Sequence, residues 1–159
     1  MNENDSKQEK LETFTRKSNI KCHGITDNPD ATPEQFQEKV FDFVKDTLGI
    51  DTMEITTERA HRLPSWTENP PIIVQFTHIR HRNIILSAFR QKRKQIVFST
   101  RVSEDFSDRG SKARTGLYPR IKESIDQCKR TYFNHDQLVV DCETYKYDTV
   151  QKTPVRVTK

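Results

Sequence analysis

The sequence predicts an α+β protein, in which a βαββαβ module is followed by a smaller lobe of helix and β-hairpin. Three observations predict this fold class. Short segments with alternating apolar residues are separated by segments in which apolar residues recur at helical spacing. The order strand, helix, strand, strand, helix, strand runs from residue 19 to residue 103. At Asp105 the pattern changes to a longer helical stretch and then two strand-like runs.

The first fifteen residues are polar apart from Leu11 and Phe14. Two apolar residues three positions apart fit a tail as well as the end of an upstream coiled-coil helix, so both alternatives stay open. We therefore divide the chain into residues 1–15 (tail or coiled-coil end), 16–103 (the βαββαβ module), 104–150 (the C-terminal domain) and 151–159 (a frayed tail).

Three strands of the module are expected at residues 19–25, 55–63 and 72–76. In the first, Ile20 and Cys22 share one face. The third is short, apolar and rich in β-branched residues, which is typical of a central strand buried on at least one face. The sequence therefore predicts a sheet with one apolar face.

The first helix has a clear start at Thr32, followed by Pro33 and Gln35. This is an N-cap with a first-turn proline and a capping box. Gly49 is a typical helix stop. The apolar stripe between these signals consists of Phe36, Val40, Phe43 and Val44.

The second helix buries Ile85, Ala88 and Phe89, and a last strand is expected over residues 95–98 and Val102, with a break near Ser99. Two βαβ-type units with right-handed crossovers then give a four-stranded antiparallel sheet with two helices on one face. This is the ferredoxin-like arrangement that RNA-recognition modules use.

The C-terminal domain begins with a helix that Ser107 can cap. Gly116 and Pro119 should break and restart this helix. A second helical stripe, which runs to about residue 130, consists of Ile121, Ile125 and Cys128. Residues 137–142 and 145–150 alternate like a hairpin around Glu143-Thr144.

The positive charge of the chain is concentrated in its middle. Residues 1–64 carry nine basic and thirteen acidic side chains, whereas residues 65–100 carry six basic and one acidic and residues 101–130 carry eight and five. The run from Arg90 to Lys94 ends a helix, where cations complement the helix dipole without any ligand. Four cations in five residues exceed that need, and more follow at Arg101, Arg109, Lys112 and Arg114. We interpret them as a nucleic-acid footprint that contacts phosphates.

The face of the predicted sheet that the two helices do not cover should lack the aromatic residues on which RNA-recognition modules stack bases. Its expected members are Lys21 and His23 on the first strand and Pro71, Ile73 and Gln75 on the third. Binding should therefore rely on the phosphate backbone and show weak sequence specificity.

Two further positions have competing interpretations. Arg62 at a sheet edge is a phosphate candidate, whereas His61 beside it is interpreted as structural or solvated. Trp66 in the following loop is interpreted as a packing residue rather than a stacking one.

Several function classes lack their signatures. No apolar run approaches the roughly 20 residues that span a bilayer, and the polar, acidic N-terminus is unlike a secretory signal. Three widely spaced cysteines have no zinc-ligand spacing, and there is no catalytic pair or phosphate-binding glycine loop. We therefore expect no enzyme, no metal and no cofactor, in a cytoplasmic protein that could also enter the nucleus.

Five fragments of the chain are informative through their order and spacing. They are Arg16-Lys17-Ser18-Asn19-Ile20-Lys21 with Gly24-Ile25, Glu58-Arg59-Ala60-His61-Arg62-Leu63-Pro64, Pro70-Pro71-Ile72-Ile73-Val74-Gln75-Phe76, Ile84-Ile85-Leu86-Ser87-Ala88-Phe89-Arg90, and Asp105-Phe106-Ser107 with Ala113-Arg114. Together they resemble the RNA-recognition and C-terminal domains of LINE retrotransposon first-open-reading-frame proteins. The chain departs from that family at Pro70-Pro71, where the family often has a basic residue.

The resemblance implies a nucleic-acid chaperone that coats its own transcript in a ribonucleoprotein particle, as a homotrimer through an upstream coiled coil. RNA would lie between the two domains. By position, the match carries binding roles onto Asn19, Lys21, Arg62, Arg90, Lys92, Arg93 and Arg114. The charge pattern adds Lys94 and Arg101 to this set of candidate nucleic-acid-binding residues.

The sequence thus predicts a protein that binds single-stranded RNA with low specificity, and single-stranded DNA is the alternative ligand. The alternative is a protein–protein interaction module on the same fold, whose aromatic-poor sheet face docks a protein instead. An enzyme such as a nuclease is the third interpretation, for which the sequence offers no metal ligands.

Overall fold

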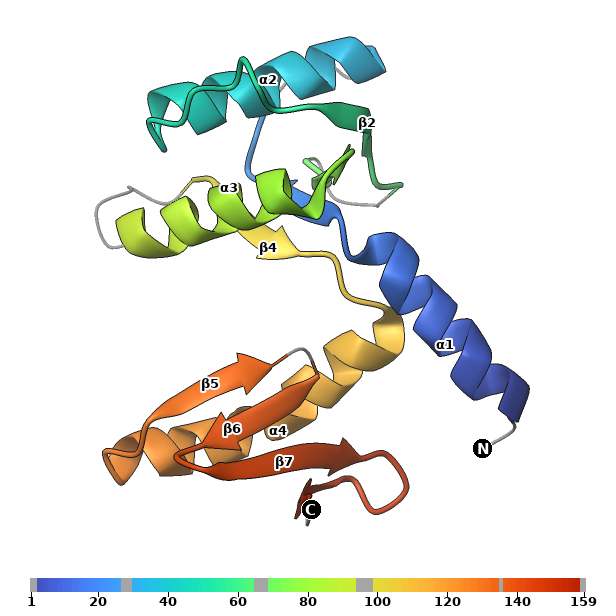
Figure 1. The fold of residues 1–159 in the computed structure, drawn as a ribbon, viewed down its shortest axis with the longest axis vertical. Helices are drawn as coiled ribbons and strands as arrows, with labels where there is room; N and C mark the ends of the chain where they lie inside the picture. Colours follow the sequence, from blue (N-terminus) through green and yellow to red (C-terminus); the bar gives the residue numbers. More distant parts are fainter. Residues whose placement is uncertain (1–2, 27–29, 65–68, 94–98, 135, 158–159) are drawn as a thin grey trace. The chain divides into compact units, whose positions relative to one another are not determined.

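The computed structural model describes residues 3–26, 30–64, 69–93, 99–134 and 136–157. These residues form four helices and eight strands, and the strands make two antiparallel four-stranded sheets (Figure 1). The predicted α+β class is confirmed. The described chain divides into an N-terminal unit of residues 10–105 and a C-terminal unit of residues 106–157 with residues 3–9.

Helix α1 spans Glu3–Arg16, so the start of the chain is helical rather than a tail. Arg16 and Glu12 form an ion pair at 2.8 Å one turn apart. Leu11 and Phe14, the two large apolar residues of this segment, are both exposed. The coiled coil that the sequence suggested upstream stays a prediction.

The N-terminal unit has the predicted order of elements. Its strands are β1 (Asn19–His23), β2 (Thr57–Arg62), β3 (Ile72–Phe76) and β4 (Arg101–Glu104), and its helices are α2 (Pro33–Asp46) and α3 (Ile79–Lys92). The strand order across the sheet is β2-β3-β1-β4, and all neighbours are antiparallel. The two strands in the middle of the sheet are β1 and β3, and β3 has the apolar, β-branched sequence expected of a central strand.

Helix α2 begins as its sequence predicts. The Thr32 side chain accepts a hydrogen bond from the backbone N–H of Gln35, and the Gln35 side chain accepts one from the backbone N–H of Thr32. This reciprocal capping box satisfies two N–H groups that the first turn would leave unpaired. Beyond the other end, Gly49 has φ +68°, a conformation that glycine adopts without a steric penalty.

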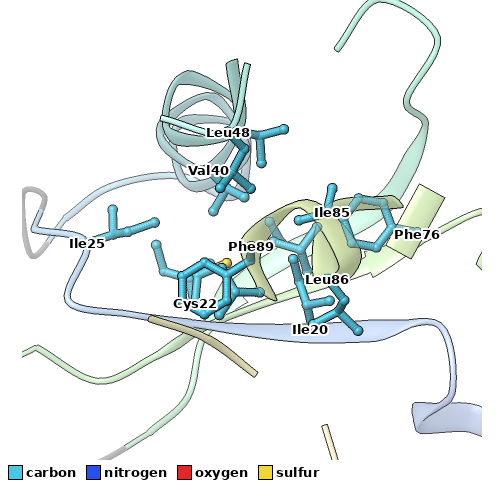
Figure 2. Close-up of a cluster of buried hydrophobic side chains, with 14 of the residues drawn as sticks. Ile20, Cys22, Ile25, Val40, Leu48, Phe76, Ile85, Leu86 and Phe89 are labelled. Atoms are coloured by element: carbon cyan, nitrogen blue, oxygen red, sulfur yellow. The ribbon is translucent and has the colours of Figure 1, made fainter. Parts of the chain in front are cut away.

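Helices α2 and α3 pack on the same face of the sheet. Figure 2 shows Ile20 and Cys22 of β1 pointing toward Ile85 and Phe89 of α3, with Val40 of α2 beside them. All five side chains are buried. The predicted helical stripes and the alternation of β1 therefore build one core between the sheet and its helices.

The C-terminal unit is a helix against a four-stranded sheet. Helix α4 spans Asp108–Asp126, and its packing partners are β5 (Thr131–Asn134), β6 (Gln137–Val140), β7 (Glu143–Asp148) and β8 (Thr153–Arg156), which pair in chain order. In Figure 1, α4 lies along one side of the β5–β7 ribbon. The core of this unit consists of Leu117, Leu138, Val140 and Tyr145.

The predicted break in the C-terminal helix is wrong, because α4 is continuous through Gly116 and Pro119. Pro119 cannot donate a hydrogen bond to the carbonyl of Thr115, which costs stability in a helix interior. Leu117 and Ile121, on either side of the proline, both pack on the sheet core. That packing holds the helix together across the proline.

The predicted end of this helix and the hairpin turn are also corrected. Helix α4 ends at Asp126, and Ile125 and Cys128 are exposed rather than part of a buried stripe. The hairpin turn lies at Asp141 and Cys142 instead of Glu143-Thr144, because Val140 pairs with Glu143. The unit has four strands where the sequence predicted two.

Residues 151–159 were expected to be frayed, but Thr153–Arg156 forms β8 and pairs with β7. The sequence pattern for this strand was weak, because β8 is an edge strand that contains Pro154 and has little apolar content. Three predictions fall outside the described residues, namely the strand segment 95–98, Trp66 and Lys94.

Candidate nucleic-acid interface

The face of the N-terminal sheet opposite α2 and α3 is termed the open face. Its members follow from the ladder register, in which Arg59 opposes Gln75, Lys21 opposes both Ile73 and Ser103, and His23 opposes Arg101. Asp105 continues the alternation just after β4. The open face thus consists of Asn19, Lys21, His23, Arg59, His61, Ile73, Gln75, Arg101, Ser103 and Asp105, a set without a Phe, Tyr or Trp side chain.

Asp105 is the centre of a buried ion cluster. Its side chain is 1% exposed, and its two carboxylate oxygens contact Lys21 Nζ (2.8 Å), Asn19 Nδ2 (3.0 Å) and Arg16 Nη1 (3.2 Å). Burial opposes the ionised carboxylate, but hydrogen bonds from Lys21 and Asn19, and the charges of Lys21 and Arg16, hold the pKa of Asp105 below its usual value. Two predicted binding residues, Asn19 and Lys21, are therefore engaged inside the protein.

Arg62 has its partners in the protein too. Its guanidinium donates hydrogen bonds to the carbonyl oxygens of Pro70 and of Ile25, the latter at 2.6 Å. The guanidinium carbon also lies 5.6 Å from the centre of the Phe36 ring. These contacts tie the end of β2 to the loops around it, so a structural role accounts for this arginine.

The basic end of α3 lies on the helix side of the sheet. Glu104 of β4 pairs with Arg82 at 2.6 Å and with Arg90 at 3.3 Å. The ammonium of Lys92 donates to the carbonyl of Thr47 at 3.4 Å, next to the end of α2. Arg93 follows α3 and is exposed.

Arg101 is exposed and lies on the open face, opposite His23. His23 Nε2 is 3.1 Å from Ser103 Oγ. Partial burial, followed by the charges of Arg101 and Lys21, lowers the pKa of His23, so the imidazole is neutral near pH 7. The predicted cations of this unit therefore occupy two sides of the sheet, with Arg101 on one and Arg90 on the other.

In the C-terminal unit, Arg114 of α4 lies between two aromatic rings. Its guanidinium carbon is 3.9 Å from the centre of the Phe133 ring and 4.3 Å from that of Phe106. Phe133 also meets Tyr118 edge to face, with ring centres 6.2 Å apart. Cation–π contacts of this kind fix the guanidinium plane beside an aromatic cluster.

Sequence reasoning missed several residues of these surfaces. Arg59 was not singled out. In a strand, neighbouring side chains point to opposite faces, so the apolar Ala60, which is buried, could have indicated that Arg59 lies on the open face. Phe106 and Phe133 were missed as well, because they are 27 residues apart and only the fold brings both rings to Arg114. His61, interpreted as structural or solvated, lies on the open face opposite Ile73.

Within the described ranges, no group of three His, Cys, Asp or Glu side chains could hold a metal ion. None of the described helices has the length and apolar character that crossing a bilayer requires. No protein-family model and no curated protein matches the chain.

Proposed function

We propose that the chain binds single-stranded RNA through its phosphates, with residues 16–103 acting as a ferredoxin-like RNA-recognition module. The observation that carries the proposal is the charge of the open face. It presents the exposed cations Arg59 and Arg101, and the one carboxylate in the set, Asp105, is already paired with Lys21 and Arg16. Such a surface favours a polyanion. The element order and the strand order β2-β3-β1-β4 support the fold assignment.

Low sequence specificity follows from the composition of the open face. The positions of β1 and β3 on the open face include His23, Ile73 and Gln75, and none of them carries a Phe, Tyr or Trp ring for stacking. Contacts between cations and phosphates give affinity and register without reading bases. Binding should therefore be similar for strands of different sequence and should weaken steeply with salt.

The resemblance to LINE first-open-reading-frame proteins adds the biological part of the proposal. A chain of that kind would coat its transcript as a cytoplasmic ribonucleoprotein particle, act as a nucleic-acid chaperone, and assemble as a trimer through a coiled coil that continues from α1. Exposed Leu11 and Phe14 on α1 fit such a helix partner. The RNA would contact both units, as the position of Arg114 in the match implies.

A salt titration with charge variants tests the proposal. Arg59→Ala combined with Arg101→Ala should weaken binding to single-stranded RNA, and the slope of log K against log salt should fall by about 0.7 for each lost phosphate contact. The matched control is Lys39→Ala with Lys45→Ala, which removes the same charge from exposed positions of α2 on the other side of the sheet. The control should keep the wild-type slope.

Two outcomes would count against the proposal. If the α2 variant loses as much affinity as the open-face variant, only the net charge matters and the open face has no special role. If wild-type protein does not bind RNA even at low salt, the interaction-module alternative is favoured instead.

A further inference from the structure

Tyr118 is a large aromatic side chain that the fold leaves half open. It lies on α4, its side chain is 56% exposed, and its edge-to-face contact with Phe133 of β5 has an interplanar angle of 84°. We propose that Tyr118 is a stacking platform for one unpaired base of a single-stranded nucleic acid. This inference rests on the proposed function and deepens it, because it adds base stacking to phosphate contact.

The ring is held in place before any ligand binds. Phe133, which Tyr118 meets edge to face, is itself packed against the guanidinium of Arg114, whose other neighbour is Phe106. Aromatic pairs of this geometry prefer a defined orientation. A ring fixed by two elements loses little conformational entropy when a base stacks on it, and this favours affinity.

The residues around the ring suit a nucleotide. Arg114, Tyr118 and Lys122 follow one another at four-residue spacing on α4, so they form a row with a rise of about 6 Å per step. Lys122 is exposed. Glu123, the nearest carboxylate along the helix, is paired with Arg120 at 3.0 Å. The row therefore places a ring between two cations.

The row favours single strands over duplexes. In a duplex the base faces are stacked on one another and closed to a side chain, whereas unpaired bases can stack on tyrosine whatever their identity. The exposure of Tyr118 has an alternative explanation, in which it belongs to an apolar contact surface together with Ile125, which lies on the same helix and is 60% exposed. Ile125 has no flat ring, so it serves as the control position.

The test uses the full chain and two probes, a short single-stranded oligoribonucleotide and an abasic strand of the same length. The variants are Tyr118→Phe, which keeps the ring, Tyr118→Ala and Tyr118→Leu, which remove it, and Ile125→Ala. Tyr118→Leu retains apolar bulk against Phe133, so it guards against a folding defect in Tyr118→Ala, and thermal unfolding is recorded for each.

We expect Tyr118→Leu and Tyr118→Ala to weaken binding of the base-bearing strand by about 5-fold to 150-fold. Tyr118→Phe and Ile125→Ala should stay within about 2-fold of wild type. The affinity for the abasic strand and the salt slope should not change in any of the four variants, because the lost contact is with a base and not with a phosphate.

The possible results distinguish a failure of the stacking role from a failure of the proposed RNA binding. Wild-type affinity of the folded Tyr118→Leu variant for the base-bearing strand would overturn the stacking role alone. An equal loss on the abasic strand, or an equal loss in Ile125→Ala, would overturn it as well. Failure of the wild-type chain to bind either strand would overturn the proposed function and the inference together.

Discussion

At the scale of single residues, Asp105 determines what its neighbours can do. A buried carboxylate is stable only when it is paired, and here Lys21, Asn19 and Arg16 provide the partners. The sequence separation of 86 residues between Asn19 and Asp105 explains why the sequence could not reveal this cluster. Asn19 and Lys21 were correctly seen as polar positions of the first strand, but their partner follows the last strand of the sheet.

Asp105→Asn should lower the free energy of unfolding at pH 7 by about 2–4 kcal/mol, because it leaves Lys21 and Arg16 without their counter-charge. The pKa of Asp105 is lower in the folded state than in the unfolded state, so its stabilisation is present above the unfolded-state pKa and is lost as the pH falls through the folded-state pKa. Urea unfolding of both proteins between pH 7 and pH 2 measures this. A gap between them that stays constant down to pH 2 would rule out an ionised Asp105 as its cause.

Cys128 affects stability through its backbone conformation and not through its side chain. Its φ is +56°, and the bonds from Lys129 N to the Ser124 carbonyl and from Cys128 N to the Ile125 carbonyl, both 2.9 Å, form the usual glycine-type end of a helix. Cys128→Gly should therefore raise the free energy of unfolding by about 0.5–1 kcal/mol. Cys128→Ala should give no such gain. Equal stabilities of the glycine and alanine variants in thermal unfolding would show that backbone strain at this position is negligible.

At the scale of elements, the sequence predicted best where local signals and burial agree. The capping box of α2, the central strand Ile72–Phe76 and the inner face of α3 were all recognisable, because each has its own periodicity or cap. The C-terminal unit was predicted less well. Gly116 and Pro119 were interpreted as helix breakers, whereas tertiary packing keeps α4 intact around them. Local propensity is a weak guide when the neighbouring residues are buried.

Gly116 has a packing reason to be in α4. A Cβ added there would lie 2.2 Å from a ring carbon of Tyr147, so the helix and β7 can approach only because the side chain is absent. Gly116→Ala should lower the free energy of unfolding by about 1–3 kcal/mol, although alanine is the better helix former. The same substitution in a Tyr147→Leu background should cost less, and a double-mutant cycle measures the difference. Additive effects of the two substitutions would contradict the close approach.

At the scale of the whole molecule, charge along the sequence located the cations but not their surroundings. Arg62 donates hydrogen bonds to backbone carbonyls and Arg90 is paired with Glu104, while Arg101 lies on the open face. Such pairings depend on register and on helix placement, which no count of charges contains. The idea that cations of both units grip one strand stays a prediction and needs its own experiment.

That experiment compares Arg114→Ala with Arg109→Ala, since both remove one charge from α4 but only Arg114 is packed between aromatic rings. If both units hold the same RNA, the contact with the C-terminal unit is effectively intramolecular once the N-terminal unit has bound. Losing that contact should lower the affinity for a long oligonucleotide by about 10-fold or more. Arg109→Ala should have a smaller effect, because an exposed single cation contributes one screened phosphate contact. Residues 10–105 alone should bind the same oligonucleotide more weakly than the full chain. If that segment, shown by circular dichroism to be folded, binds with full strength, then the N-terminal unit acts alone and a groove shared by both units is excluded.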